Sequence, residues 1–361
     1  MRPRRVAICG GGTGGHTFPA LAVARKLRQA LPSVRLSFIG TKRRLEAEIL
    51  SRAEEDFYPL SISGIRGRGW KVIPSVLRIP GAFLEAFRLL RKLRPDLVVG
   101  VGGYSSGPVV LLASLLGTPT VLLEQNVKPG LTNRLLLPFV RKAAASFERT
   151  LPALKGKGVF LGNPVREEFE ALKPRVPDGK LSLLVFGGSQ GSRFLNEVMI
   201  GALPHLAPVK NRLVIRHQTG EAGTARVLDA YGRAGFEGAE VSAFIVDMAS
   251  AFGRADLVLC RAGATTVAEL IAARRPALLV PFVRAAGGHQ TENARELERA
   301  GAAETWNERL LTPEKLAERV LFYAGRPDRL QAMTRNLEPL RTENAAGRIA
   351  ELCLEIMGLG T

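Results

Sequence analysis

The stretch that decides the fold is RRVAICGGGTGGH, residues 4–16. Its aliphatic residues end in a run of glycines, and a segment with helical periodicity follows from Pro19 to Leu31. A short aliphatic strand, a glycine turn and an amphipathic helix are the parts of a βαβ unit. We therefore predict a strand over 4–9, a loop over 10–16 and a helix that starts at Pro19, since proline is tolerated in a first helical turn.

The second half of the chain opens in the same way. LSLLVF (181–186) predicts a strand, GGSQGS (187–192) a loop, and residues 193–203 a helix. The halves agree again at Asp96-Leu97-Val98-Val99 and Asp256-Leu257-Val258-Leu259, each followed by a glycine loop, a helix and another aliphatic strand. We predict an α/β fold with two Rossmann-like parallel-sheet domains, residues 1–163 and 164–361, whose last helix could return to the first domain. Ligands should bind at the carboxyl ends of the strands, facing a cleft.

The composition narrows the class of protein. A chain of 361 residues suits two domains, and 46% apolar residues is normal for a globular protein. The net charge of +18 indicates an anionic partner, such as nucleic acid, anionic lipid or a phosphorylated substrate. No recognition-helix or base-stacking pattern favours nucleic acid. Three scattered cysteines form no metal or disulfide pattern and fit a cytoplasmic protein.

An uncharged run from Leu97 to Leu123 is long enough for a membrane-spanning helix. Its glycines and prolines would break such a helix repeatedly. We predict a strand, a glycine loop, a buried helix and a second strand instead.

The first glycine loop is suited to phosphate, because its N–H groups and the helix N-terminus behind them attract anions. The spacing of Gly10, Gly12 and Gly15 also fits the dinucleotide fingerprint. However, no acidic residue ends the second strand, Leu36 to Gly40, to hold a ribose. A two-domain NADP-dependent oxidoreductase stays as the alternative. His16 is either a helix-start residue that hydrogen-bonds the loop, or a general base or phosphate donor.

Two motifs in the second half extend this pattern. GGSQGS (187–192) is either a packing turn or a second phosphate loop. RAGATTVAE (261–269) places small and hydroxyl residues at a strand end, which suits close approach of a diphosphate. Glu269 follows one turn later, and a carboxylate can accept two charge-assisted hydrogen bonds from adjacent sugar hydroxyls. An ordinary solvated helix glutamate is the competing interpretation.

Together and in order, these motifs resemble the MurG family of inverting glycosyltransferases. The resemblance spans nearly the whole chain, and its segments are GGTGGH (11–16), GGYSSG (102–107), EQN (124–126), GNPVR (162–166), GGSQG (187–191), RAGATTVAE (261–269) and HQTENA (289–294). It implies a GT-B fold and transfer of GlcNAc from UDP-GlcNAc to the C4 hydroxyl of MurNAc in undecaprenyl-pyrophosphoryl-MurNAc-pentapeptide. It also implies no cofactor, a peripheral place on the cytoplasmic face of the inner membrane, and cell-wall synthesis enzymes as further partners.

The resemblance assigns roles by position. The implied substrate-binding residues are Thr13, Gly14, Gly15, Asn126, Arg166, Ser189, Gln190, Gly191, Ile245, Ala264, Thr265, Thr266, Val267, Ala268, Glu269, His289 and Gln290. The backbone of Ile245 would meet uracil, Glu269 the ribose hydroxyls and Gln290 the GlcNAc hydroxyls. The first glycine loop with His16 would take the acceptor diphosphate, the acceptor hydroxyl or both, and Glu124 is the next candidate for the catalytic base. No Asp-X-Asp motif follows a strand end, so we expect backbone N–H groups rather than a metal to balance the leaving diphosphate.

The basic excess has a plausible location between Ile65 and Pro95, where eight basic residues face one acid, Glu85. Cations interleaved with aromatic and aliphatic residues are typical of an interfacial membrane anchor. The expected membrane residues are Trp70, Ile73, Val76, Arg78, Ile79 and Phe83. The other interpretation is a helix packed on its own sheet with a solvated basic back, and we expect both on different faces.

Overall fold

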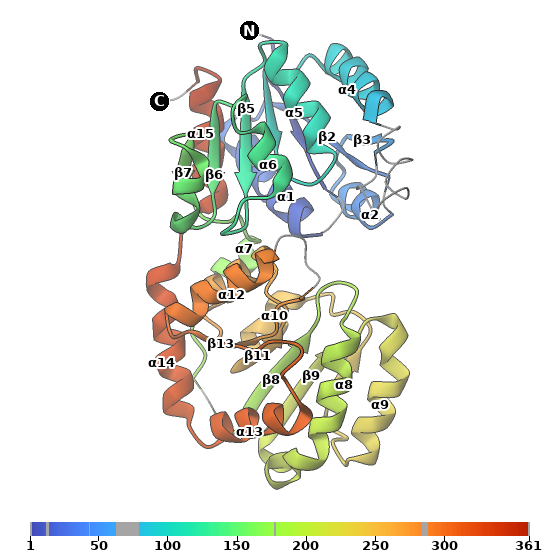
Figure 1. Ribbon diagram of the computed structural model, residues 1–361, viewed down its shortest axis with the longest axis vertical. Coiled ribbons are helices and arrows are strands. Elements are labelled where there is room, and N and C mark those ends of the chain that lie inside the picture. Colours follow the sequence, from blue (N-terminus) through green and yellow to red (C-terminus); the bar gives the residue numbers. More distant parts are fainter. Residues whose placement is uncertain are drawn as a thin grey trace. The chain divides into compact units, whose positions relative to one another are not determined.

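The computed structural model describes residues 2–11, 14–42, 44–62, 79–176, 178–283 and 288–359. The chain forms two compact units (Figure 1). Unit 1 comprises Met1–Arg166 and Thr342–Thr361, and unit 2 comprises Glu167–Arg341. The sequence placed the division at 163; here the first crossing follows Arg166, and the chain after Arg341 belongs to unit 1 again.

Unit 1 is built on a seven-stranded parallel sheet with strand order β3-β2-β1-β4-β5-β6-β7. Its strands are β1 (Arg5–Cys9), β2 (Arg35–Thr41), β3 (Phe57–Leu60), β4 (Leu97–Gly100), β5 (Thr120–Glu124), β6 (Lys142–Ala145) and β7 (Gly158–Phe160). Its helices are α1 (Gly14–Ala30), α2 (Arg44–Arg52), α4 (Ile79–Leu93), α5 (Ser106–Leu115), α6 (Leu131–Leu136), the 3-10 helix η2 (Glu148–Leu154) and α15 (Ala345–Ile356).

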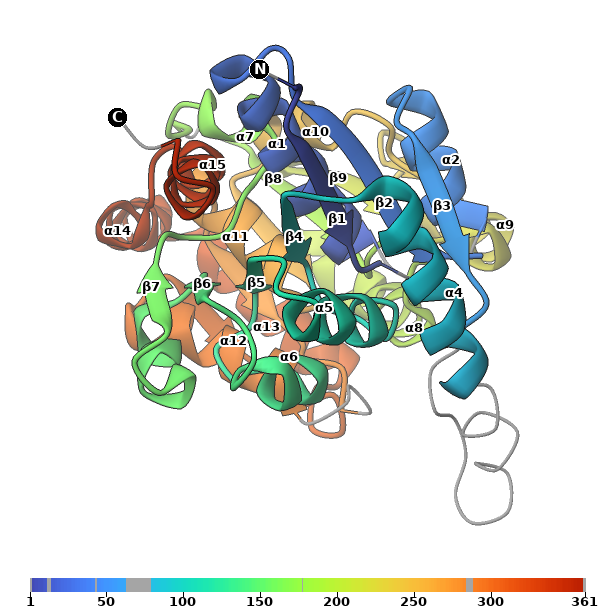
Figure 2. The ribbon, with the colours of Figure 1, turned by 90° about the horizontal axis from the view of Figure 1, so that it is seen from above.

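Both faces of this sheet are covered, as its aliphatic strands require. Side chains alternate across a strand, so Val6 and Ile8 pack into one core with α1 and α15, while Ala7 and Cys9 pack into the other. Figure 2 shows α4, α5 and α6 on one side of the sheet and α1 and α15 on the other. The uncharged run predicted as strand, loop, helix and strand is confirmed as β4, α5 and β5. Among the described residues, no helix has the length and apolar character needed to cross a membrane.

Unit 2 repeats the plan with a six-stranded parallel sheet, in the order β10-β9-β8-β11-β12-β13. Its strands are β8 (Leu181–Phe186), β9 (Leu213–Gln218), β10 (Glu240–Ser242), β11 (Leu257–Cys260), β12 (Ala277–Leu279) and β13 (Ala303–Thr305). Its helices are α7 (Glu167–Glu170), α8 (Arg193–Ala202), η3 (Leu203–Arg212), η4 (Glu221–Gly223), α9 (Thr224–Arg233), α10 (Met248–Arg254), α11 (Ala264–Ala273), α12 (His289–Arg299), α13 (Pro313–Ala324), α14 (Pro327–Leu337) and η6 (Glu338–Leu340).

One helix start differs from the prediction. Helix α1 begins at Gly14, and Pro19 lies inside it rather than at its first turn. Proline removes one N–H and crowds the carbonyl four residues earlier. That position is Gly15, in the first turn of the helix, so few intrahelical hydrogen bonds are at stake and the helix continues.

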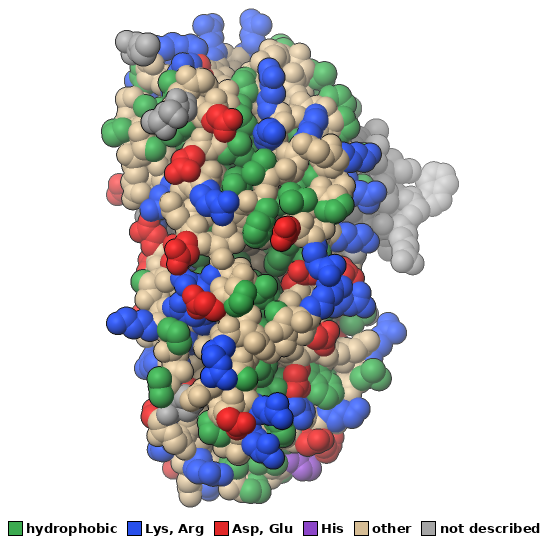
Figure 3. Space-filling model, turned by 90° about the vertical axis from the view of Figure 1, so that its left-hand side faces the viewer, with side chains coloured by type: hydrophobic (Ala, Val, Ile, Leu, Met, Phe, Trp, Pro, Cys, Tyr) green, Lys and Arg blue, Asp and Glu red, His purple; other side chains and the backbone are tan. Residues whose placement is uncertain are grey.

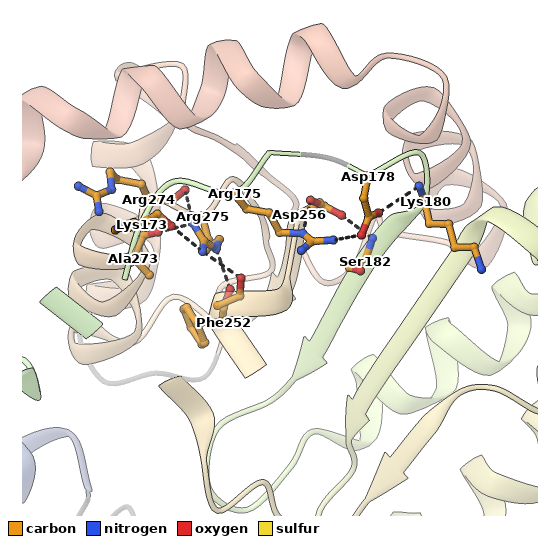
Figure 4. Close-up of polar contacts among 11 residues, drawn as sticks. Lys173, Arg175, Asp178, Lys180, Ser182, Phe252, Asp256, Ala273, Arg274 and Arg275 are labelled. Carbon is orange, nitrogen blue, oxygen red and sulfur yellow. Dashed lines mark hydrogen bonds and ion pairs between the residues drawn. The ribbon is translucent and has the colours of Figure 1, made fainter. Parts of the chain in front are cut away.

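Each unit fastens the start of its two central strands with one aspartate. In unit 2 the Asp256 N–H donates to the Ser182 carbonyl at 2.8 Å, and the Ser182 N–H donates to the Asp256 carboxylate at 2.8 Å (Figure 4). Asp96 makes the same pair of bonds with Arg5 in unit 1, at 2.7 and 2.9 Å. In both units an arginine donates to the other carboxylate oxygen, at 2.7 Å. The repeated Asp-Leu motif in the sequence therefore joins β1 to β4 and β8 to β11 in the same way.

Unit 2 also holds a buried guanidinium among backbone carbonyls (Figure 4). Arg275 is 2% exposed and donates to the carbonyls of Phe252, Gly253, Ala273, Arg274 and Lys173. Two of these carbonyls end α10 and two end α11, where the helix dipole favours a cation. Burial lowers the pKa of Arg275 to about 10. Since Lys173 lies in the segment that enters unit 2, Arg275 ties that segment to the ends of two helices.

Candidate functional site

The strand order of each sheet reverses at one point, which is where open α/β sheets bind ligands. In unit 1 this point lies between β1 and β4, and in unit 2 between β8 and β11. Gly10 and Gly11 follow β1, the glycine loop at 187–192 follows β8, and the segments from 101 and from 261 follow β4 and β11. The described parts of the expected phosphate loops therefore lie at the two switch points.

In unit 1 two glycine segments meet backbone to backbone. The Gly11 N–H donates to the Gly102 carbonyl at 3.3 Å. A Cβ on Gly10 would lie 2.4 Å from that carbonyl oxygen, and a Cβ on Gly103 would lie 2.6 Å from the Gly11 oxygen. Only glycine permits this approach, which brings the first loop beside the GGYSSG segment.

His16 lies in the first turn of α1, next to this junction. A Cβ on Gly102 would lie 3.1 Å from His16 Nε2, so the ring lies against the second glycine segment. Burial of the ring lowers the pKa of His16 to about 4. The imidazole is therefore neutral near pH 7, as a general base requires. Gly14 and Gly15 form the same helical turn, and Thr13 lies outside the described residues.

The start of α5 adds two serines to which the sequence analysis gave no role. Ser105 and Ser106 are both fully buried, and the Ser106 hydroxyl donates to the Gly103 carbonyl at 2.9 Å. Within the described part of the chain, the Ser105 hydroxyl has no hydrogen-bond partner. A glycine loop followed by hydroxyl residues at a helix start was the pattern that marked the other loops, so the signal was present in GGYSSG.

Glu124 ends β5 and is 1% exposed. Its Oε1 accepts the Asn126 N–H at 2.9 Å and the Asn126 side-chain amide at 3.2 Å. Its Oε2 accepts the Gly130 N–H at 2.9 Å and the Asn133 amide at 2.8 Å. Burial raises the pKa of Glu124, and the four donors oppose that shift. With four N–H groups on two oxygens, the carboxylate holds the 124–133 turn and sets the place of Asn126.

Arg166 is the last residue of unit 1 before the crossing, and its guanidinium lies 5.1 Å from the centre of the Phe18 ring on α1. The structure thus gathers His16, Glu124, Asn126 and Arg166 in unit 1. Of the expected membrane residues, Trp70, Ile73, Val76 and Arg78 lie outside the described residues. Ile79 begins α4, and Phe83 is half-buried on the same helix.

In unit 2 the GGSQGS loop interlocks with the end of β9. A Cβ on Gly191 would lie 2.0 Å from the Thr219 carbonyl oxygen, and a Cβ on Gly220 would lie 2.3 Å from the Gln190 oxygen. Ser189 and Gln190 remain exposed at the tip of the loop. The side chain of Gln218 connects this loop to Ile245 through hydrogen bonds with the Gly188 carbonyl and the Ile245 N–H.

The N-terminus of α11 lies beside this loop in unit 2, held by Arg261. The Arg261 guanidinium is nearly buried and donates to Ser192 Oγ at 2.9 Å, to Glu308 at 3.0 Å and to the Val280 carbonyl at 3.1 Å. Ala264, Thr265 and Thr266 are half-buried, whereas Val267, Ala268 and Glu269 are buried. The Val267 N–H donates to the Gly263 carbonyl at 2.9 Å, which is a first-turn hydrogen bond of α11.

His289 and Gln290 begin α12 and are half-buried. Gln290 Oε1 accepts the Phe282 N–H at 2.8 Å, and the Asn293 amide donates to the Ala262 carbonyl at 3.3 Å. Helix α12 is thereby fixed to the loop that precedes α11. Within the described ranges, no group of three or more His, Cys, Asp or Glu side chains could hold a metal ion.

Residues 6–145 match the glycosyltransferase family 28 N-terminal domain, and residues 182–351 match the family 28 C-terminal domain. The chain is 44% identical over 357 residues to a protein of Anaeromyxobacter sp. (strain Fw109-5), with 98% of this chain and 93% of that protein covered. That protein is named UDP-N-acetylglucosamine--N-acetylmuramyl-(pentapeptide) pyrophosphoryl-undecaprenol N-acetylglucosamine transferase. The identically named protein of Myxococcus xanthus (strain DK1622) is 41% identical over the same shares.

Among solved structures, that of Acinetobacter baumannii MurG is similar to this chain with a TM-score of 0.79 at 32% identity, and the match covers 98% of this chain and 100% of that one. The two-sheet α/β architecture expected from the resemblance, a GT-B fold, is confirmed. The chain therefore belongs to glycosyltransferase family 28 and, within it, to the MurG family.

Proposed function

We propose that this protein transfers GlcNAc from UDP-GlcNAc to the C4 hydroxyl of MurNAc in undecaprenyl-pyrophosphoryl-MurNAc-pentapeptide. The observation that carries the proposal is the 44% identity over 98% of the chain to a relative named for this transfer. The glycine loops and helix starts at the two switch points add chemical support, because backbone segments of this kind bind phosphates and both substrates carry a diphosphate.

The donor belongs to unit 2. The exposed Ser189 loop and the N-terminus of α11, with its helix dipole, receive the diphosphate, and Glu269 accepts hydrogen bonds from the ribose hydroxyls. The Ile245 N–H is already donated to Gln218, so Ile245 meets uracil through its carbonyl, an acceptor for the ring N–H. Gln290, whose Oε1 holds the Phe282 N–H, meets the sugar through its amide NH2. Preorganised N–H groups of this kind stabilise the charge that develops on the leaving UDP.

The acceptor belongs to unit 1. Its diphosphate is received at the start of α5, where the Ser105 hydroxyl is buried beside the glycine junction. His16 takes the proton of the C4 hydroxyl as that oxygen bonds to the anomeric carbon, while the bond from that carbon to the UDP oxygen breaks. A single displacement of this kind inverts the anomeric centre. Glu124 acts as a positioning residue that holds Asn126.

Unit 1 also carries the membrane surface. Helices α4, α5 and α6 lie side by side on one face of the sheet, and each leaves apolar side chains exposed there or at its end: Leu84, Phe87, Leu115, Leu116, Leu131, Leu135 and Phe139. Ala82, Ala86 and Leu90 of α4 are buried. The same helices and their ends expose Arg88, Arg91, Lys92, Arg134 and Arg141. Figure 3, which faces the side of unit 1 where α15 and β7 lie, shows hydrophobic side chains among lysines and arginines there too. Such a surface binds peripherally to anionic lipid.

Thermal unfolding with and without nucleotide tests the donor assignment. A ligand that binds only the native state stabilises it by about 2.7 kcal/mol at a concentration of 100 Kd. We expect UDP and UDP-GlcNAc to raise Tm and NADPH to leave it unchanged. A rise with NADPH alone would instead support the oxidoreductase alternative.

Vesicle co-sedimentation tests the membrane surface. We expect binding to vesicles with anionic lipid, weaker binding at high salt, and a loss of binding in Leu131→Ser/Leu135→Ser. Leu228→Ser is the matched control, because Leu228 is an exposed leucine on α9 of unit 2. Equal binding of the α6 variant and the control would assign the surface elsewhere.

A further inference from the structure

One buried side chain connects the two segments of unit 2 that the proposed function assigns to the nucleotide. Gln218 is the last residue of β9 and is 1% exposed. Its Nε2 donates to the Gly188 carbonyl at 2.9 Å, and its Oε1 accepts the Ile245 N–H at 2.8 Å. The two ends of a single amide group therefore hold the phosphate loop and the uracil segment at a fixed separation.

The bond to Gly188 fixes the direction of the next peptide. The Gly188 carbonyl also accepts the Gly191 N–H at 2.9 Å, so two donors hold it. In a trans peptide the carbonyl and the following N–H point in opposite directions. The Ser189 N–H therefore points away from Gln218, and Ser189 is exposed. This N–H is turned outward, where an anionic group can accept it.

Without the bond from Gln218, only the Gly191 N–H would hold the Gly188 carbonyl, and this peptide could turn over more easily. Gly188 has a φ of +95°, and a Cβ there would meet no atom within 4 Å, so glycine is required for its conformation and not for space. Because glycine has no Cβ, the peptide beside it can rotate at small steric cost. The turned peptide would present its carbonyl oxygen, instead of an N–H group, to a phosphate.

We propose that Gln218 is a positioning residue for the sugar nucleotide: it keeps the Ser189 N–H directed at the diphosphate and the Ile245 backbone directed at the base. The proposal rests on the donor assignment to unit 2. It predicts that Gln218 controls affinity for UDP-GlcNAc although it is buried behind both loops.

Gln218→Glu removes one bond of the pair. A carboxylate still accepts the Ile245 N–H, but its second oxygen faces the Gly188 carbonyl oxygen and repels it. We expect affinity for UDP-GlcNAc to fall roughly 10- to 100-fold at pH 8, as for loss of a hydrogen bond to a charged group. Burial raises the pKa of a carboxyl group. As the pH falls the neutral acid forms, its O–H donates to the Gly188 carbonyl, and the affinity relative to wild type recovers.

Calorimetric titration with UDP-GlcNAc from pH 8 to pH 5.5 measures this ratio. Gln218→Met, which loses both bonds, should bind weakly at every pH. Tyr231→Phe is the matched control, since it removes another buried hydrogen bond of unit 2, to His217 at 3.1 Å, without touching either loop. It should lower Tm and leave the affinity at the wild-type value.

The outcomes distinguish a failure of the positioning role of Gln218 from a failure of the donor assignment to unit 2. If wild type does not bind UDP-GlcNAc, the donor assignment fails. If wild type binds and Gln218→Glu binds equally well at pH 8, or shows a deficit that does not shrink on acidification, Gln218 has no positioning role. If Gln218→Glu does not fold at pH 8, Gln218→Met decides: weakened binding supports the role, and wild-type affinity overturns it.

Discussion

Replacing Glu124 by glutamine separates the two roles open to this residue, general base and positioning residue. The carboxylate accepts four N–H groups, two on each oxygen, from Asn126, Gly130 and Asn133. Glutamine keeps the shape but turns one oxygen into an NH2 group. Whichever way the amide is oriented, two of the four N–H donors then face its NH2 group, which is also a donor.

The size of the effect follows from that count. An unsatisfied buried donor costs about 1–3 kcal/mol, so we expect Glu124→Gln to lose roughly 2–4 kcal/mol of the free energy of unfolding after some relaxation of the turn. The displaced Asn126 should raise KM for the substrates and lower kcat by about tenfold or less. Loss of a general base would instead lower kcat by about 10²–10⁴ with little effect on stability.

Urea unfolding followed by circular dichroism gives the first quantity, and turnover at a temperature where the variant is folded gives the second. Glu148→Gln is the control, because Glu148 is an exposed glutamate of η2 in the same unit. A Glu124→Gln protein as stable as wild type, with kcat reduced a hundredfold or more, would refute the positioning role and make Glu124 the base.

Four further outcomes are expected. Burial lowers the pKa of His217 from 6.5 to about 4. As the pH falls through that range, His217 is protonated in the unfolded chain before the folded one, which removes about 3 kcal/mol from the free energy of unfolding. This loss should be absent from His217→Gln when urea unfolding is compared at pH 7 and pH 4. His16→Ala should lower kcat by about 10²–10⁴. Because the pKa of His16 is about 4, the kcat/KM of the wild type should stay level from pH 8 to below pH 6, instead of falling near pH 6.5. Glu269→Ala should lower kcat/KM for UDP-GlcNAc by roughly tenfold or more, and unchanged kinetics in the folded variant would remove Glu269 from the ribose site. Arg275→Met leaves its carbonyl partners without their cation and should cost about 3 kcal/mol in urea unfolding, whereas exposed Arg329→Met should cost almost nothing.

The sequence predicts the parallel sheets well because the signals are local. An aliphatic run that ends in glycine predicts β1 and β8 within a residue of their observed bounds. The start of α1 was placed five residues late because proline usually marks a first turn, while here glycines begin the helix. The return of α15 to unit 1 depends on which core accepts Ile349 and Cys353, and only the folded chain shows that this core is the one beside α1.

The features of the candidate site likewise divide into those that local sequence signals predict and those that depend on the folded chain. Glycine loops and helix starts were found from sequence because their backbone conformations restrict the residue type. Gln218 was missed because a buried polar side chain gains its role from partners far along the chain, here Gly188 and Ile245. Ser105 was missed although the GGYSSG motif carries the same pattern as the other loops. Glu124, in the EQN motif, was the next candidate for the catalytic base, but its four hydrogen-bond donors belong to the turn after β5, and the sequence analysis did not predict them.

Both units use a buried glutamine behind the loop that follows a central strand. Gln125 Nε2 donates to the Val101 carbonyl at 3.0 Å in unit 1, as Gln218 Nε2 does to Gly188 in unit 2. Each bond turns a carbonyl toward the sheet and therefore turns the next N–H, of Gly102 or Ser189, the other way. An arginine or lysine in the same place would hold the carbonyl but would bring a charge into the protein interior, at a large desolvation cost. A neutral amide gives the same orientation without that cost, and it leaves the positive potential of the loop to the N–H groups that, in the proposed function, receive a diphosphate.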